Sequence, residues 1–504
     1  MINDVVNELI SYAKIHLGMK DFDSLYFKNV VLGELGLKFP SINPVDEDKI
    51  KNMKTPDYFV DEMESYLVNS RSFSVKEAEL EAIKIMGLIS PNPSVVVDKY
   101  NEIKKESTRR AVDYLYDLSI KNYYIAKTKI DKNIVWDTDW NSKNLEISIN
   151  LSKPEKNNKD IAKLISKEAN LEEKYPKCLL CLENLGFYGN DKQPARENIR
   201  VIPMNLAGDE WYLQYSPYGY YYMHCICFSK YHKNMTIERK TFQRLLDFVD
   251  QVPCFFIGSN ADLPIVGGSI LNHEHFQGGE HILPVMRCKP LKEYGMKKYH
   301  DSKLYKLDWY NSCILIESKN KEELINLSTE ILDGWRKYTD LDNDIVCFDD
   351  KGRHNTITPS VRKVNDTYYM YLILRNNRCN DMYPDGIFHA HKEYHHIKKE
   401  GIGIIEAMGL FILPARLVRQ SNEIKDVLEK NFNDNSILEK YPDLEDFLPM
   451  IHELSNDYNP STVDKNIKEY INTTCKNILI NTGVFKDDTK GNAGFDKFIG
   501  GLNL

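Results

Sequence analysis

The pattern of apolar and polar positions divides the chain into a helical beginning, a β-rich middle and a helical end. In the first part, Ser74 and Glu77 have the spacing of a capping box, and apolar residues follow it at helical intervals. Between residues 145 and 151 apolar and polar residues alternate strictly, which predicts a strand. The polar run 152–158 that follows predicts a loop or linker. We therefore expect residues 1–135 to form a helical extension.

From Cys178 to about residue 417, short β-rich runs occur in clusters and are not separated each time by a helix. We predict strands within 211–215, 220–228 and 255–257, and a helix around 242–249. This pattern favours an antiparallel sheet with helices on its face over a doubly wound parallel sheet, so the predicted fold class is α+β. Residues 418–504 return to helical spacing.

Composition and charge narrow the class of protein. The chain has 504 residues, of which 42% are hydrophobic, enough for a large core and several domains. Its net charge of −8 gives no basic bias of the kind that favours binding to duplex nucleic acid or anionic lipid. The most apolar segment, 401–413, is shorter than the roughly 20 residues that a bilayer requires. Ten irregularly spaced cysteines are typical of a reduced protein, so we expect a cytoplasmic location.

The densest run of reactive side chains lies between Gly267 and His281. If residues 272–277 are extended, His273, His275 and Gln277 project from one face, because side chains alternate along a strand. A glycine pair precedes this motif and another follows it, which allows a ligand to approach the backbone closely.

The chemistry of this motif fits group transfer. A neutral imidazole can attack phosphorus near neutral pH, and the resulting N–P bond is broken readily by a second nucleophile. The carboxamide of Gln277 can donate to a phosphoryl oxygen without titrating, and so can stabilise developing charge. The alternative is a set of polar residues on an exposed strand, but convergent polar groups between glycine pairs favour a functional site.

A second group of reactive residues lies upstream. Cys178 and Cys181 have the spacing at which two thiolates in one turn clamp a metal ion. Candidates for the other half of such a site are Cys225, Cys227, His232 and His273. A Cys2His2 site made of Cys178, Cys181, His232 and His273 would tie the reactive segment to the preceding subdomain. The alternative is a pair of packed thiols.

A third cluster, 388–396, repeats the His-x-His alternation at His389 and His391. It lacks the following glutamine and the flanking glycine pairs. We interpret it as a solvated, partly structural strand, with a metal or phosphate site as the alternative.

Several segments together point to a family. They are 178–184, 214–218, 226–232, 259–279 and 354–359. The run from Ser259 to Gly279 closely resembles the galactose-1-phosphate uridylyltransferase family, and in particular its bacterial branch with a long N-terminal extension. The resemblance is specific between residues 178 and 281 and looser to about residue 417.

The resemblance implies two histidine-triad-like halves, each an antiparallel sheet with helices. On this basis we expect four regions: 1–135 helical, 136–300 and 301–417 as the two halves, and 418–504 helical. It also implies a reaction in which UDP-glucose and galactose 1-phosphate exchange the uridylyl group, giving glucose 1-phosphate and UDP-galactose, and a homodimeric enzyme of galactose metabolism.

Roles of individual residues follow from the same resemblance. His275 matches the nucleophile that becomes uridylylated, and Gln277 matches the residue that holds the phosphoryl oxygens. Asn260 and Ser269 lie where the family contacts phosphates. The positions that match the ligands of a structural zinc ion are Cys178, Cys181, His232 and His273. A second metal site of the family would map to His389 and His391.

The chain departs from the better-known branch of the family near the nucleophile. That branch has proline between its two histidines and another just before them, where this chain has Glu274 and Asn272. The spacing from Ser269 to His273 is also one residue longer.

Two other functions compete with the transferase. A histidine-triad nucleotide phosphorylase or hydrolase would carry a third histidine in place of Gln277, to pass a proton to its leaving group. Sugar 1-phosphates leave without protonation, so the glutamine favours a transferase. A non-catalytic, zinc-stapled module that binds nucleotide sugars is the second alternative.

Overall fold

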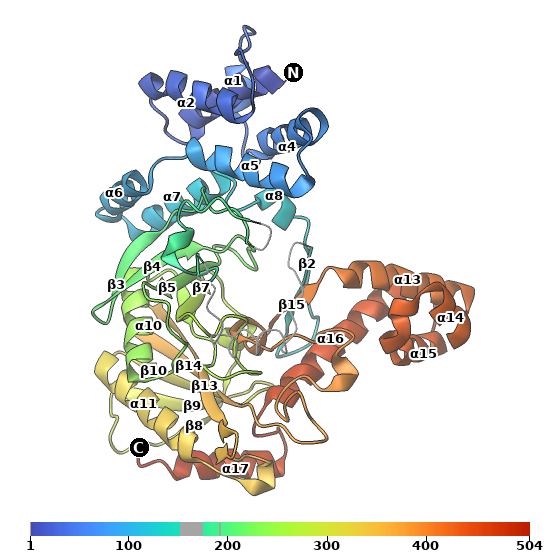
Figure 1. Cartoon of the computed structure of the whole chain (residues 1–504). Coiled ribbons are helices and arrows are strands. Elements are labelled where there is room, and N and C mark those ends of the chain that lie inside the picture. Colours follow the sequence, from blue (N-terminus) through green and yellow to red (C-terminus); the bar gives the residue numbers. More distant parts are fainter. Residues whose placement is uncertain (1, 152–174, 191–192) are drawn as a thin grey trace. The chain divides into compact units, whose positions relative to one another are not determined.

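The computed structural model describes residues 2–151, 175–190 and 193–504 (Figure 1). Its residues fall into two compact units, Met1–Lys132 with Leu171–His232 and Asn133–Asn170 with Lys233–Leu504. The polar run 152–158, expected to be a loop or linker, lies outside the described residues.

The first unit begins with the helices that the apolar spacing predicts. They are α1 (Ile2–His16), α2 (Asp21–Glu34), α3 (Glu47–Lys51), α4 (Asp57–Arg71), α5 (Val75–Leu88), α6 (Pro93–Lys104), α7 (Thr108–Lys121) and α8 (Lys127–Ile130). The capping box is present at the start of α5, where the Ser74 side chain accepts from the Glu77 backbone and Glu77 accepts from Ser74. The prediction of a helical N-terminal region is confirmed.

Three antiparallel strands complete the first unit. They are β3 (Ile202–Leu206), β4 (Asp209–Tyr215) and β5 (Cys225–Ser229). The hydroxyl of Tyr215 donates to the Val112 carbonyl on α7 at 2.9 Å, which links β4 to the helices. The strand predicted within 220–228 is wrong in its first half, because turns occupy residues before Cys225 and the Tyr220 ring stacks on His224 there.

The second unit is built on an antiparallel sheet. In sheet order its strands are β7 (His275–Gly279), β6 (Phe256–Gly258), β13 (Asn355–Val364), β14 (Thr367–Asn376), β10 (Cys313–Ser318), β9 (Ser302–Leu307) and β8 (Pro290–Tyr294). Helices α10 (Arg239–Gln251) and α11 (Lys321–Lys337) lie side by side and both contact β13 (Figure 1). The helix predicted around 242–249 is thus part of α10, and its apolar residues cover the sheet.

The order of elements repeats along the chain. The series β3, β4, β5, α10, β6 and β7 is followed by β8, β9, β10, α11, β13 and β14. A short hairpin of β11 (Phe348–Asp349) and β12 (Gly352–Arg353) is inserted before β13. Three strands, a helix and two strands therefore occur twice, which agrees with two halves of similar construction and confirms the α+β class.

A small sheet joins distant parts of the second unit. Its strands are β1 (Ile134–Asp137), β2 (Glu146–Asn150) and β15 (Leu410–Pro414), with β2 parallel to β15. The strand predicted from residue 145 is confirmed as β2. Its polar side chains are buried as well as its apolar ones, contrary to the alternation; the carboxylate of Glu146, for example, binds His281 and Arg287.

The chain ends in helices, as predicted. They are α12 (Ile404–Ala407), α13 (Arg416–Lys430), α14 (Asp434–Lys440), α15 (Leu448–Asn456), α16 (Val463–Thr482) and α17 (Thr489–Gly500). Within this group α15 contacts both α13 and α16 (Figure 1). None of the helices in the described parts of the chain combines the length and apolarity needed to cross a membrane.

Candidate functional site

The His-x-His-x-Gln motif lies at the start of β7, in the second unit. The strand begins at His275 and pairs with β6, where Gln277 lies opposite Gly258. His275 and Gln277 are two residues apart on the strand and so project from the same face. The expected extension back to residue 272 is wrong: His273 lies in a bend before the strand, so alternation does not set its direction.

One ring nitrogen of His275 is committed to the backbone. Its Nδ1 lies 2.8 Å from the carbonyl oxygen of His273. A carbonyl can only accept, so Nδ1 carries the proton and Nε2 carries the lone pair. Burial lowers the pKa of His275 to about 4, because the charged imidazolium loses its hydration there. The side chain is therefore a neutral imidazole near neutral pH, with the lone pair on Nε2.

Asn260 follows β6 and is only 3% exposed. Its Oδ1 accepts from the backbone N–H of Ile404 at 2.8 Å, and this contact identifies the other end of the amide as Nδ2. A Cβ at Gly268 would lie 2.4 Å from that Nδ2. Only glycine at position 268 leaves room for the Asn260 amide to lie this close to the backbone. Ser269, the next residue, is exposed.

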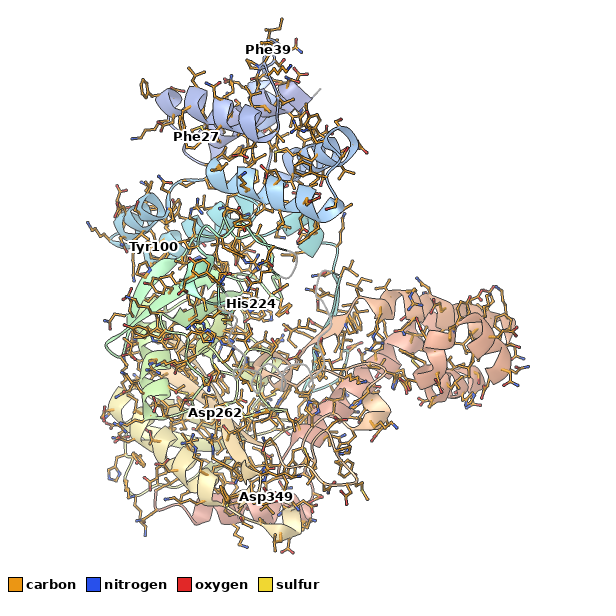
Figure 2. The ribbon with its side chains drawn as sticks, viewed as in Figure 1. Phe27, Phe39, Tyr100, His224, Asp262 and Asp349 are labelled. Atoms are coloured by element: carbon orange, nitrogen blue, oxygen red, sulfur yellow. The ribbon has the colours of Figure 1, made fainter. Side chains whose placement is uncertain are left out.

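The loop that carries Asn260 is pinned through Asp262, which Figure 2 labels. The Asp262 carboxylate accepts from the Ile237 backbone N–H at 3.1 Å and from Nη2 of Arg353 at 2.9 Å, and it also bonds the hydroxyl of Thr356. These contacts come from two separate segments of the second unit, one at Ile237 and one at 353–356. They fix the backbone two residues after Asn260.

The candidate metal ligands of the first unit converge. Sγ of Cys178 and Sγ of Cys181 are 3.6 Å apart, and Nδ1 of His232 lies 3.2 Å from the second sulfur. Asn184 shapes this turn, because its Nδ2 donates to the carbonyls of both cysteines at 2.8 Å. The facing sulfur of Cys181 and burial raise the pKa of the Cys178 thiol well above its usual range.

These donors fit a metal ion. Their ligand atoms lie within 4.8 Å of one another, and two soft sulfurs with one imidazole form a set suited to zinc or another thiophilic ion. Binding would release the thiol protons. The fourth expected ligand, His273, is a fully buried residue of the second unit.

Two other cysteines considered as ligands have packing roles. Cys225 and Cys227 are buried on β5, and the sulfur of Cys227 lies 4.0 Å from that of Met204. Burial raises the pKa of Cys227 well above its usual value, which favours the uncharged thiol.

The third histidine cluster differs from the expected solvated strand. Residues 388–396 form turns and a short 3-10 helix, and His389 is completely buried. Nε2 of His389 accepts from the Ile402 backbone, whereas Nε2 of His391 contacts the Ile387 carbonyl and its ring stacks on Tyr383. Both histidines therefore contact the backbone, and this arrangement does not support the expected second metal site.

Comparison with known proteins places this geometry in a family. Residues 60–234 match the model of the galactose-1-phosphate uridyl transferase N-terminal domain. A galactose-1-phosphate uridylyltransferase of Clostridium acetobutylicum is 42% identical, over 99% of this chain and 99% of its own length. Those of Caldanaerobacter subterraneus subsp. tengcongensis and Fusobacterium nucleatum are 42% and 38% identical, over at least 96% of every chain. The chain belongs to the galactose-1-phosphate uridylyltransferase family.

Within this family, the better-known branch has proline where this chain has Glu274. The structure shows why a proline would not serve here. The Glu274 backbone N–H donates to the Lys233 carbonyl at 2.8 Å, and a proline has no N–H. The Glu274 side chain is buried and binds Nη1 of Arg244 at 2.6 Å.

Two positively charged residues of this family member escaped the sequence analysis. Arg244 lies on the buried face of α10, and Arg375 is completely buried on β14. Arg244 has a detectable signal, since it falls three residues after Thr241 and four before Phe248 on a stripe otherwise without charge. Arg375 has none, because it follows a continuous apolar run without a periodic break.

Proposed function

We propose that this protein exchanges UMP between UDP-glucose and galactose 1-phosphate through a covalent uridylyl-His275 intermediate. The observation that carries the proposal is the state of His275: a neutral imidazole whose Nδ1 is bonded to the backbone and whose Nε2 holds a lone pair. Membership of the uridylyltransferase family gives this nucleophile its substrates.

The reaction has two balanced steps. In the first, Nε2 of His275 attacks the α-phosphorus of UDP-glucose, an N–P bond forms, and the bond to the bridging oxygen breaks with its electron pair on glucose 1-phosphate. In the second, a phosphate oxygen of galactose 1-phosphate attacks the same phosphorus. UDP-galactose forms and the N–P electron pair returns to Nε2. Neither leaving group requires a proton, so a residue that cannot titrate suffices beside the nucleophile.

Gln277 fills that place. It lies two residues after His275 on β7 and on the same face, so its amide can donate to the phosphoryl oxygens as charge develops on them. Asn260 and Ser269 are proposed to bind phosphate oxygens. The free end of the Asn260 amide, Nδ2, is the donor that its contact with Ile404 leaves for a ligand.

We also propose a structural zinc ion held by Cys178, Cys181, His232 and His273. Its chemistry would be to cross-link these ligands, with no part in the transfer steps. The donor set and the sulfur and nitrogen distances in the first unit support this site. His273 supplies the carbonyl that orients His275, so fixing His273 would hold the nucleophile in its tautomer.

Incubation with UDP-glucose alone tests the proposed reaction. A transferase releases one equivalent of glucose 1-phosphate per active site and then stops, because no acceptor is present. Continued release would instead support a phosphorylase or hydrolase that passes the uridylyl group to phosphate or water.

The His275→Ala variant tests the remaining alternative. We expect exchange to fall by at least about 10⁴-fold while UDP-glucose still binds, because only the nucleophile is lost. A non-catalytic binding module predicts that this variant binds like the wild type and that the wild type shows no exchange either.

Location and assembly complete the proposal. We propose a homodimer in the cytoplasm with nucleotide sugars and hexose 1-phosphates as its ligands, organised in the regions 1–135, 136–300, 301–417 and 418–504. Sedimentation of the purified protein measures its assembly directly, and a monomeric mass at working concentration would overturn the dimer.

A further inference from the structure

The segment Gly401–Ile404 is held by hydrogen bonds from three other parts of the second unit. Nη2 of Arg375 donates to the Ile402 carbonyl at 2.8 Å. The Ile402 N–H donates to Nε2 of His389 at 3.3 Å. Two residues later, the Ile404 N–H donates to Oδ1 of Asn260 at 2.8 Å. Both polar backbone groups of Ile402 are therefore fixed, and the third bond reaches a proposed phosphate-binding residue.

The two side chains that hold Ile402 are completely buried. Arg375 and His389 are both 0% exposed, and neither Nε of Arg375 nor Nδ1 of His389 has a hydrogen-bond partner among the described residues. A buried guanidinium is costly in free energy unless its hydrogen bonds compensate. The hydrogen bond from Arg375 to the Ile402 carbonyl is charge-assisted, which indicates that Arg375 holds this part of the backbone.

Gly403 lies between the two held residues and touches Asn260. A Cβ at Gly403 would lie 2.9 Å from Oδ1 of Asn260, closer than real Cβ contacts allow. The segment thus approaches the Asn260 amide as closely as the absence of a side chain permits. A small shift of Ile402 would be transmitted directly to the amide.

We propose that Arg375 is a positioning residue for uridylyl transfer, which acts through Ile402 and Ile404 to hold the Asn260 amide with Nδ2 toward the substrate phosphate. This role rests on the proposed function. His389 assists by holding the N–H of the same Ile402.

The physical reason lies in the asymmetry of an amide. Asn260 can present either an acceptor oxygen or a donor NH₂ group to a ligand, and the two ends have nearly the same shape. Oxygen lone pairs repel a phosphate, whereas the NH₂ group binds it. The Ile404 N–H selects the orientation because it can only donate, so Oδ1 must face it. Loss of Arg375 releases the segment and allows the repulsive orientation.

A double-mutant cycle tests this route of action. Arg375→Met should lower kcat/KM for exchange by about tenfold, the effect of one hydrogen bond to a charged group. In an Asn260→Ala background the same substitution should have almost no further effect, because the amide through which it acts is gone. A purely structural role predicts equal losses in both backgrounds, and that result would overturn the proposal.

Two further variants keep the test informative if Arg375→Met folds poorly. Gly403→Ala leaves the buried charge in place and pushes on Oδ1, so it should lower exchange and again lose its effect in Asn260→Ala. Arg378→Met is the matched control, since Arg378 donates to the Asp344 carbonyl away from this segment, and its exchange rate should match the wild type. An effect of Gly403→Ala that persists in Asn260→Ala would contradict the proposal.

Binding separates this inference from the proposed function. The affinity for UDP-glucose of the same variants is measured by calorimetry in a His275→Ala background, where no transfer occurs. If Arg375→Met loses affinity only when Asn260 is present, and the wild-type protein shows no exchange, the proposed reaction is refuted and the role of Arg375 stands. If the wild type shows exchange, and Arg375→Met loses the same affinity with and without Asn260, the role of Arg375 is refuted and the reaction stands.

Discussion

The Glu274 carboxylate lies 2.6 Å from Nη1 of Arg244, and both side chains are only 2% exposed. Glu274 separates His273 from the proposed nucleophile, so this ion pair anchors the reactive segment to α10. We expect Glu274→Gln to lower the free energy of unfolding by about 3–5 kcal/mol, because it removes the buried negative charge that faces both Arg244 and Lys233. Urea denaturation measures the loss.

A surface ion pair provides the control for this prediction. Arg109 and Asp113 lie 3.0 Å apart on α7 with roughly 40% of each side chain exposed. Asp113→Asn should change the free energy of unfolding by less than about 0.5 kcal/mol. Equal effects of Glu274→Gln and Asp113→Asn would show that burial of the first pair has no consequence.

Buried histidines make the stability depend on pH. Burial lowers the pKa of His389 to about 3 and that of His396 to about 4, whereas an unfolded histidine has a pKa of about 6.5. Between these values the unfolded chain binds protons that the folded chain does not. The contribution of these histidines to the free energy of unfolding is therefore fully present above about pH 6.5. It falls as the pH decreases, by up to about 1.4 kcal/mol per pH unit for each histidine.

His396→Phe isolates one of these contributions. The His396 ring packs edge-on against Phe447 at 5.1 Å, and phenylalanine keeps a ring there without a titrating nitrogen. Free energies of unfolding at pH 7.5 and pH 5 should differ less in this variant than in the wild type. The exposed His300, substituted by Gln, should leave the difference unchanged.

Removal of metal should weaken the fold. We expect protein purified without chelator to carry one zinc ion per chain by elemental analysis, and a chelator to lower its Tm. Cys178→Ser should lose the metal, whereas Cys227→Ser, at a packed position beside Met204, should retain it. Fully active wild-type protein without metal would reduce Cys178 and Cys181 to packing residues.

Gln277 should act on the rate of transfer and not on the identity of the nucleophile. Gln277→Ala removes one donor from the developing phosphoryl charge, for which a loss in kcat of about 10²–10³-fold is expected. Rapid-quench measurement of uridylylation should still show the modification on His275. An unchanged rate would mean that Gln277 does not contact the phosphoryl group.

Local motifs made part of the site predictable from the sequence. The two-residue spacing of His275 and Gln277 and the three-residue spacing of Cys178 and Cys181 each place side chains together through a short stretch of backbone. The helical regions were predictable for the same reason, since capping and periodicity are local. His232 was one of four candidates for the other half of the metal site, because 51 residues separate it from Cys181 and no local spacing singles it out.

The remaining contacts have no local signature. Asn260 and Ile404 are 144 residues apart, and a bond between a side chain and a distant backbone N–H leaves no pattern in the chain. Burial of Glu146 on β2 also depends on distant residues, because its carboxylate binds His281 and Arg287. The bend at His273 reflects its neighbour Glu274, whose N–H is drawn to Lys233.

Intact-mass spectrometry after brief exposure to UDP-glucose, quenched without acid, tests the central claim most directly. We predict a mass increase of one uridylyl group per active site, located on His275 by peptide mapping and removed by galactose 1-phosphate with release of UDP-galactose. Protein that shows no such adduct while exchange proceeds, or an adduct on another residue, would contradict the account.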